Sequence, residues 1–459
     1  MEYFNQSQTD WRISQCCQFH DKTLAKRYNL GTTTKTYALK EGGKDRVQSK
    51  ALSNCRKLED ILTTYFPTQP IHLRSFRISS ELFPCYTLDF TREWYDEIRE
   101  EIKTILARAG EAARRHSVRL SVHPGQYTVL ASNKPDVVEK SIEDLEYHAL
   151  YGQYMNIPAQ DFSMNIHLQG LYGGKHEDGI KRFATHFPYL SDYAQGCLSV
   201  ENEDKPNGYD IHHTLELAQR IPIRCTLDTH HYACHRMVET ERVKIGEKTV
   251  NRKVRDVDHI THTSDYFVEA VKSWRGVRPL FHKSQSFHPD NSNYWMKPNA
   301  HSETYWDEDL MANHVPMLEY ADFDIEAKHK EVAVQGFYDF LKQEEEFVDT
   351  VEESTFKLLE LNAVLGAGVG QVGTYTGAVD DLGNAIRSQR LNEQLSNMAS
   401  NQGAIQESID RAMPSFIDAR RNTERYAVEQ EFLAQQLHDT TDAVEDQTNS
   451  VTELSQEMI

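Results

Sequence analysis

Short runs rich in β-branched and aromatic residues alternate along the chain with longer stretches of helical, amphipathic spacing. Eight runs are typical of strands, at residues 11–16, 73–79, 118–123, 162–167, 197–202, 223–228, 278–283 and 322–327. Amphipathic stretches such as 91–116 and 135–155 lie between most of them, and the second begins at Pro135, a residue that favours helix entry. A succession of eight β–α units predicts the α/β fold class, as a (β/α)8 TIM barrel.

The pattern changes beyond residue 340. Pro414 is the only proline of residues 341–459, which contain no Cys or Trp and include a Gly-rich stretch. The apolar spacing there is that of weakly amphipathic helices. We therefore predict a barrel domain over 1–340 and a C-terminal α-helical extension over 341–459. The extension is expected to bind a protein partner or to oligomerise, and a disordered tail is the alternative.

Composition places the barrel in a reducing, aqueous compartment. The 459 residues are 39% hydrophobic and 26% charged, which is typical of a packed globular core. No apolar run approaches the roughly 20 residues that cross a bilayer, and the first residues do not resemble a secretory signal. The seven cysteines are odd in number and lack zinc-finger spacing. These features predict a cytoplasmic protein without a membrane partner.

The net charge of −20 argues against a protein that holds nucleic acid by overall basicity. It leaves room for local basic patches and for bound divalent ions that contact phosphates. Residues 236–255 form one basic segment. The segment is interpreted either as a solvated charged insertion or as a DNA-contacting element.

The predicted strands share a chemical feature at their carboxyl ends. Six successive runs end in side chains that bind metals: His123, His167, Glu201, Asp228 with His231 just after it, His282 and Glu326. A barrel places the carboxyl ends of its strands on one face, where its active site lies. His123 is followed at once by Pro124-Gly125, which ends the strand after the ligand has been placed.

Each of these residues also has a structural interpretation. Asp228 is a candidate helix N-cap, Glu201 a solvated loop acid, and Glu326 a partner for Lys328. His230 is the rival of His231 for the inward position. The metal hypothesis rests on the conjunction of six strand ends, since separate accidents seldom produce such a series.

Mixed histidine and carboxylate ligands suit Zn²⁺ or Mn²⁺, and a carboxylate can bridge two ions. Several ions at one site fit phosphodiester hydrolysis. Sugar isomerases use the same ligand types on the same barrel, so the ligands alone leave both reactions open.

The segment "VRLSVHPGQYTVL" and the later motifs "NIHLQGLYGGK", "LSVENED", "LDTHHYAC" and "FDIEAKHKE" resemble the UV damage endonuclease family. The resemblance covers residues 11–335. It implies a manganese-dependent repair nuclease that acts on UV-damaged double-stranded DNA. Such enzymes nick immediately 5′ to cyclobutane dimers and (6-4) photoproducts, leaving a 3′-hydroxyl and a 5′-phosphate.

The same resemblance implies roles for particular residues. Metal ligands would be His123, His167, Glu201, Asp228, His231, His282, His301 and Glu326, holding two or three Mn²⁺ ions, with Zn²⁺ or Mg²⁺ as alternatives. Glu201, Asp228, His231 and Glu326 would be catalytic. His301 is preferred to His314 because "HSE" resembles the family motif. Gln126 and Tyr127 match the pair that probes the lesion, and a rim core aromatic is the other interpretation of Tyr127.

Three departures weaken the resemblance. Leu88 and Leu280 stand where many family members have a metal-site histidine and a carboxylated lysine. The third departure is near the N-terminus, where the segment "RISQCCQFHDK" shows no obvious match to the family's lesion-contacting tyrosine and asparagine. Lys283 is next to His282 and is expected on the other face of its strand. Alternatives are therefore an abasic-site endonuclease or sugar isomerase, or a degenerate barrel that binds DNA or a partner without cutting it. A barrel joined to such an extension is compatible with a DNA-associated, virus-encoded fusion.

Overall fold

The computed structural model describes residues 10–205, 207–235, 237–245, 248–255, 259–291, 293, 297 and 299–343, with the backbone alone for 237–255. The chain divides into two compact units, residues 1–307 with 314–339, and residues 308–313 with 340–459. The first unit contains the barrel. Of the predicted extension over 341–459, only residues 341–343 lie within the described residues, and they are helical.

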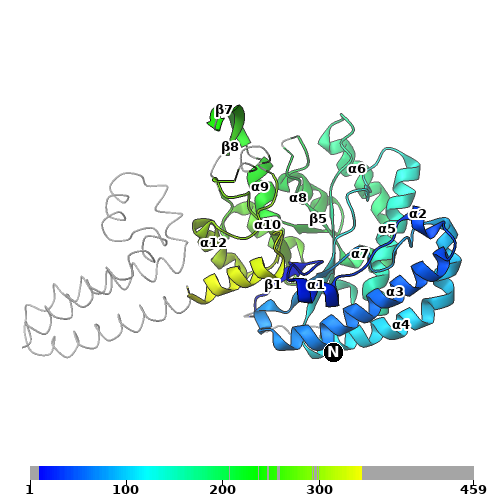
Figure 1. Ribbon diagram of the computed structural model, residues 1–459. Helices are drawn as coiled ribbons and strands as arrows, with labels where there is room; N and C mark the ends of the chain where they lie inside the picture. Colours follow the sequence, from blue (N-terminus) through cyan, green and yellow to red (C-terminus); the bar gives the residue numbers. More distant parts are fainter. Residues whose placement is uncertain are drawn as a thin grey trace, which may run out of the picture. The chain divides into compact units, whose positions relative to one another are not determined.

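Eight parallel strands form the barrel, and each of the eight predicted runs contains one (Figure 1). The strands are β1 (Ile13–Cys16), β2 (Ser75–Ile78), β3 (Arg119–Val122), β4 (Phe162–His167), β5 (Leu198–Glu201), β6 (Arg224–Thr226), β9 (Leu280–Lys283) and β10 (Asp322–Ile325). Their order in the sheet is β6-β5-β4-β3-β2-β1-β10-β9. The TIM-barrel prediction is therefore confirmed.

The barrel closes between its two outermost strands, β6 and β9, through a short seam. Asp228 and His282 form an isolated parallel bridge, and the amide of His282 donates to the carbonyl of Leu227 at 2.9 Å. Elsewhere neighbouring strands pair over two to four residues, as Met164–His167 do with Leu198–Glu201. Two candidate metal ligands thus lie on opposite sides of the closing seam.

Helices surround the barrel in the order expected of β–α units. Their bounds are α1 (Lys22–Tyr28), α2 (Lys35–Ala38), α3 (Gly43–Asp60), α4 (Arg92–Arg115), α5 (Pro135–Tyr154), α6 (His176–His186), α7 (Asp192–Cys197), α8 (Ile211–Arg220), α9 (Thr229–His235) and α10 (Asp265–Ser273). The predicted helices over 91–116 and 135–155 are confirmed as α4 and α5, with Pro135 in the first turn of α5. Among the described residues, no helix is both long and apolar enough to span a bilayer.

The strands alternate between a polar face and an apolar face. In β5, Ser199 and Glu201 belong to the same face, and Glu201 approaches side chains of strands across the barrel, so this face is the interior. Leu198 and Val200 occupy the outer face, where the helices cover them. Since both faces are buried, apolar side chains stabilise the helix–sheet layer while the interior is free to carry the polar groups of a site.

The amino-terminal end of the barrel interior is filled by a buried ionic cluster. The Asp322 carboxylate accepts from Arg119 Nη1 at 2.7 Å, from Arg278 Nε at 2.6 Å and from the Arg12 amide at 2.9 Å. Arg119 also lies over the ring of Trp274, at 5.8 Å. Burial alone would raise the pKa of Asp322, but Arg119 and Arg278 outweigh it and hold the pKa below its ordinary value. This cluster closes the end of the barrel opposite the candidate site.

Candidate metal centre

The carboxyl ends of the strands bring the predicted ligands together. Three groups of side chains each place their ligand atoms within 4.8 Å of one another. The groups are His123 with Glu201 and His282, His167 with Glu201 and His231, and Asp228 with His282 and Glu326. Residues that are far apart in the sequence therefore form one continuous cluster, because six of them lie at or just after the carboxyl end of a strand and His231 lies in the first turn of α9, which follows β6.

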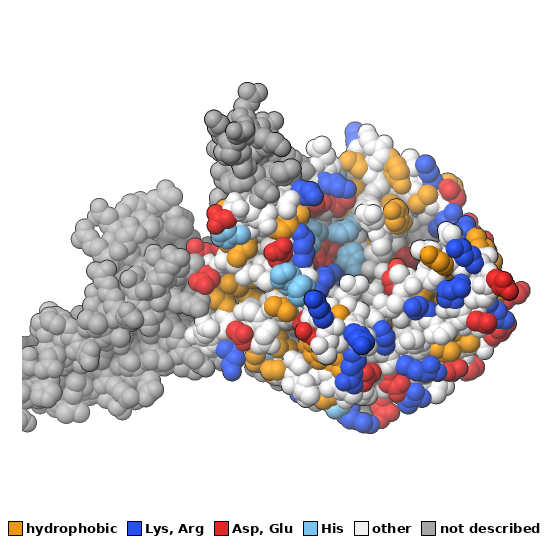
Figure 2. Space-filling model, viewed as in Figure 1, with side chains coloured by type: hydrophobic (Ala, Val, Ile, Leu, Met, Phe, Trp, Pro, Cys, Tyr) orange, Lys and Arg blue, Asp and Glu red, His pale blue; other side chains and the backbone are white. Residues whose placement is uncertain are grey.

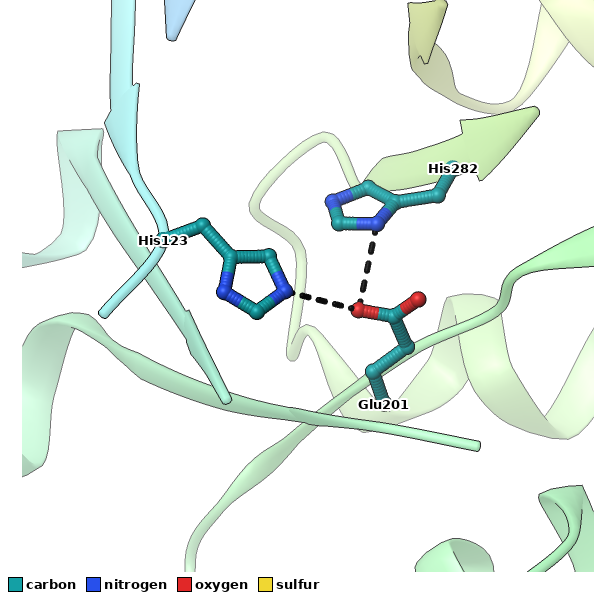
Figure 3. Close-up of side chains that lie close together, drawn as sticks. All are labelled: His123, Glu201 and His282. Carbon is teal, nitrogen blue, oxygen red and sulfur yellow. Dashed lines mark hydrogen bonds and ion pairs between the residues drawn. The ribbon is translucent and has the colours of Figure 1, made fainter. Parts of the chain in front are cut away.

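Glu201 lies at the centre of the cluster (Figure 3). Its Oε2 atom is 3.3 Å from His123 Nε2 and 3.1 Å from His282 Nδ1, and its Oε1 atom is 3.0 Å from His231 Nδ1. The side chain is fully buried at the end of β5. A single carboxylate with histidines on both oxygens has the arrangement of a bridging ligand.

The orientation of His123 follows from the residue after it. Its Nδ1 atom is 2.9 Å from the carbonyl oxygen of Pro124, and a carbonyl only accepts, so Nδ1 carries the proton. The remaining ring nitrogen, Nε2, faces Glu201 Oε2 at 3.3 Å and is the one that a metal ion would bind. The turn at Pro124 thus both ends β3 and sets the histidine tautomer.

The structure separates the rival histidines. His301 Nδ1 is 3.7 Å from Glu326 Oε2, and its ring lies 6.0 Å from that of His231. His314 is buried away from these ligands, and burial lowers its pKa well below the ordinary range. His230 Nε2 contacts the carbonyl of Asn299 at 3.3 Å rather than Glu201. The geometry thus places His231 beside Glu201 and His301 beside Glu326, whereas the ring of His230 lies near His301 without facing Glu201.

Asp228 has a geometry that is compatible with both of the roles that the sequence left open. Its Oδ1 atom accepts from the amide of His231 at 2.7 Å, in the first turn of α9, as a helix cap does. Within the described part of the chain, its Oδ2 atom has no hydrogen-bond partner although it is buried. The capping contact therefore leaves the Oδ2 atom of Asp228 available to bind a metal ion.

Supporting residues that sequence reasoning missed hold the ligands in place. Asn165 donates to Glu201, and Arg77 forms an ion pair with Glu326. Asn202 accepts from the Asp228 amide at 2.9 Å, and Asp324 Oδ2 is 3.6 Å from His282 Nε2. Asn165 and Asp324 stand two positions before His167 and Glu326, so period-two alternation was the signal that pointed to them. Lys328 lies 3.6 Å from the Phe287 ring, so the suggested Glu326–Lys328 pair is not the contact that orients Glu326.

The charges of the cluster are strongly coupled. Burial would raise the pKa of Glu201, but His282 and His167 outweigh it and hold the pKa well below its ordinary value. Burial lowers the pKa of His167 to about 4. For His282 burial acts in the same direction, but Glu201 and Glu326 reverse it and raise the pKa to about 9. Glu201 thus remains ionised and attracts positive charge from its surroundings.

This donor set fits divalent metal ions. His167 Nδ1, like Asp228 Oδ2, is buried and lacks a hydrogen-bond partner among the residues that the structure describes. Buried polar atoms without partners cost free energy unless another group satisfies them. Histidine nitrogens and carboxylate oxygens are the ligands of Zn²⁺ and Mn²⁺.

The departures from the family pattern have clear locations. Leu280 is buried at the start of β9, paired with Asp322 and therefore near the ionic cluster. Leu88 lies just before a short 3-10 helix, Asp89–Thr91. Lys283 is buried with its ammonium group 4.1 Å from the Phe337 ring, whereas His282 contacts Glu201. This confirms the expectation that Lys283 lies on the opposite face of the strand.

The loop after β3 presents Gln126 and Tyr127 to solvent. The Tyr127 side chain is 85% exposed, so its interpretation as a core aromatic is wrong. The residues just after it are anchored. The Val129 amide donates to Ser141 at 2.8 Å, and Arg182 donates to the carbonyl of Ala131 at 2.7 Å. An exposed aromatic on a fixed base is well suited to contact an external ligand.

Figure 2 shows histidine side chains gathered in a hollow of the face viewed, with Lys and Arg side chains around it. The side chains of His123, His167 and His301 are 18%, 22% and 29% exposed, so a substrate can reach this side of the ligand cluster. The Lys and Arg side chains around the hollow offset locally the negative net charge of the chain.

Comparison with known proteins identifies the family. The family model described as UV-endonuclease UvdE matches residues 18–357, which extends beyond the barrel boundary predicted at 340. A UV DNA damage endonuclease of Nostoc sp. is 29% identical over 316 residues, covering 68% of this chain and 86% of the relative. A UV-damage endonuclease of Schizosaccharomyces pombe is 31% identical over 268 residues, 56% of this chain and 39% of the relative.

A viral relative and a solved structure extend the comparison. A putative UV-damage endonuclease of Acanthamoeba polyphaga mimivirus is 26% identical over 344 residues, 71% of this chain and 90% of the relative. The crystal structure of SacUVDE shares the fold with a TM-score of 0.57 at 24% identity, covering 72% of this chain and 98% of that one. The chain therefore belongs to the UV-endonuclease UvdE family and is an endonuclease.

Proposed function

We propose that this endonuclease repairs UV-damaged double-stranded DNA by a metal-dependent nick immediately 5′ to cyclobutane dimers and (6-4) photoproducts. The products would be a 3′-hydroxyl and a 5′-phosphate. The observation that carries the proposal is the cluster of seven ligand side chains centred on Glu201 at the open end of the barrel. The names of the relatives support the choice of UV-damaged DNA as substrate.

The ligands would be His123, His167, Glu201, Asp228, His231, His282, His301 and Glu326, with Mn²⁺ preferred and Zn²⁺ or Mg²⁺ as alternatives. When bound, two or three such ions would lower the pKa of a water molecule and stabilise charge on the phosphate and leaving oxygens. Asn165 and Asn202 orient Glu201 and Asp228, and Arg77 holds one oxygen of Glu326. The buried cluster thus preorganises its ligands before a substrate arrives.

The exposed pair Gln126 and Tyr127 would sense the lesion. A stacking side chain inserted at a damaged step replaces base–base contacts, and a damaged base leaves the stack at lower cost than an intact one. The anchored base of the loop keeps the pair in position without burying it.

A plasmid assay tests the proposal. Supercoiled plasmid, UV-irradiated or not, is incubated with the protein in Mn²⁺ and in chelator, and the nicked form is measured. We expect only the irradiated plasmid to be nicked, and only when Mn²⁺ is present. End-labelled oligonucleotides that contain one dimer should then map the cut to the 5′ side of that dimer.

Other outcomes separate the alternatives. Cleavage of abasic plasmid without cleavage of irradiated plasmid would favour an abasic-site endonuclease, and aldose–ketose conversion would favour an isomerase. Tight binding of irradiated DNA with no nick, from protein shown to be folded, would identify a degenerate barrel and overturn the proposal.

Replacing Tyr127 with Ala tests the lesion sensor. The side chain packs against little, so the free energy of unfolding should change by less than about 0.5 kcal/mol. Loss of stacking on a base should weaken binding of dimer-containing duplex by about 1–3 kcal/mol, roughly 5- to 150-fold. Fluorescence anisotropy in chelator measures this affinity.

Two matched variants serve as controls. Tyr127→Phe retains the ring and should bind nearly as the unaltered protein does. Tyr189→Ala removes another exposed tyrosine, 66% exposed at the end of a 3-10 helix over Phe187–Tyr189, and should leave binding unchanged. Equal losses for Tyr127→Ala and Tyr189→Ala would count against a lesion-sensing role.

A further inference from the structure

The basic segment found in the sequence forms an antiparallel hairpin. It comprises β7 (Met237–Ile245) and β8 (Lys248–Arg255), and begins two residues after α9 ends (Figure 1). Arg242 pairs with Asn251, and Lys244 pairs with Thr249. The hairpin is thus a two-stranded ribbon attached to the helix that carries His231.

The pairing register divides the ribbon into two unlike faces. Directly opposed residues of an antiparallel pair share a face, and successive residues alternate. One face, here named the cationic face, consists of Thr240, Arg242, Lys244, Thr249, Asn251, Lys253 and Arg255. The other face, here named the mixed face, consists of Glu239, Glu241, Val243, Ile245, Lys248, Val250, Arg252 and Val254.

The two faces differ sharply in charge. The cationic face carries four basic residues and no acidic one, whereas the mixed face has two basic and two acidic residues that cancel. The chain as a whole has a net charge of −20, so a face without acids departs from its composition. Arg, Lys, Thr and Asn are among the side chains that contact phosphate oxygens in protein–DNA complexes.

The dimensions of the ribbon suit a DNA duplex. The seven residues of α9 directly follow Asp228 and rise about 10 Å, so the base of the hairpin lies close to Asp228. The nine residues of β7 extend about 30 Å, the length of about nine base pairs. A two-stranded ribbon also fits the major groove.

We infer that the β7–β8 hairpin is a second DNA-binding surface, whose cationic face contacts the phosphates of the duplex flanking the cleavage site. The inference rests on the proposed function for its substrate. It adds a sequence-independent contact that increases affinity for the duplex, separate from the metal cluster and from the Gln126–Tyr127 pair.

Two matched double variants test this assignment. The first variant, Arg242→Gln with Lys253→Gln, removes one Arg and one Lys from the cationic face. The second variant, Lys248→Gln with Arg252→Gln, also removes one Arg and one Lys, but from the mixed face. Binding of an undamaged duplex of 30 base pairs is measured in chelator at several salt concentrations, using the full chain.

The plot of the logarithm of the association constant against the logarithm of salt concentration has a negative slope. In the cationic-face variant this slope should be shallower by about 2, because each phosphate that the protein no longer neutralises reduces its magnitude by about 0.9. Its affinity at 0.1 M salt should fall by a factor on the order of ten or more. The mixed-face variant should retain the slope of the unaltered protein. Equal effects of both variants, or no effect of either, would overturn the inference.

This test is independent of the photoproduct proposal. Undamaged DNA and chelator exclude both lesion recognition and cleavage from the measurement. A slope that changes only in the cationic-face variant supports DNA binding by the β7–β8 hairpin even if irradiated plasmid is not nicked. If the cationic face binds an acidic protein segment instead, the slopes for DNA will not differ between the variants.

Discussion

Replacing Glu201 with Gln should reduce nicking of irradiated plasmid in Mn²⁺ by more than about 100-fold. Loss of a partner that merely orients a ligand typically costs 10- to 100-fold, and Glu201 is itself the group that contacts three histidines. Gln retains the size of the side chain but removes its charge and one acceptor oxygen. The variant should also lose most of the increase in melting temperature that Mn²⁺ confers on the unaltered protein.

The control for Glu201→Gln is Glu203→Gln. Glu203 is two residues further on, and its Oε2 atom accepts from the amide of Tyr209 at 2.8 Å rather than facing the cluster. Glu203→Gln should nick irradiated plasmid and respond to Mn²⁺ as the unaltered protein does. Full nicking and a full Mn²⁺ response from Glu201→Gln would remove Glu201 from the metal site.

Among the substitutions proposed here, Asp322→Asn should cause the largest decrease in the free energy of unfolding. The carboxylate is fully buried between Arg119 and Arg278, and removing its charge leaves two guanidinium groups without their counterion. Breaking a buried pair in this way costs about 3–5 kcal/mol of unfolding free energy, or a fall in melting temperature of roughly 6–20 °C. Chemical denaturation and thermal unfolding measure the two quantities.

The pH dependence of this loss has a definite sign. Because the folded pKa of Asp322 is lowered, its charged form contributes stability above the unfolded pKa of about 3.9. That contribution is lost as pH falls through the folded pKa. The difference between Asp322→Asn and the unaltered protein should be complete at pH 7 and smaller at pH 3. Exposed Glu319→Gln is the control and should change stability little at either pH.

The strands could be predicted from sequence because each is short, β-rich and buried on its outer face. Phe162, Met164 and Ile166 alternate with Ser163, Asn165 and His167, so one strand carries both the apolar layer and the polar interior. Six of the candidate ligands were identifiable for the same reason, since they stand at or near strand ends where the alternation stops, whereas His301 was indicated only by the family resemblance.

The supporting contacts were harder to predict. Arg77 belongs to β2, whereas its partner Glu326 follows β10, and only closure of the barrel brings the two together. The hairpin was detectable in principle, because alternation resumes on both sides of Gly246. Its density of charge led to an interpretation as a solvated insertion or a DNA contact without a secondary structure.

The short seam between β6 and β9 has a consequence for folding. The two outermost strands of the sheet meet at Asp228 and His282, which belong to one group of candidate ligands with Glu326. An ion held by these residues would tie the two free edges of the sheet to each other. Metal binding and closure of the barrel would then be linked equilibria. The same residues that bind the metal would therefore also stabilise the β6–β9 seam against local unfolding.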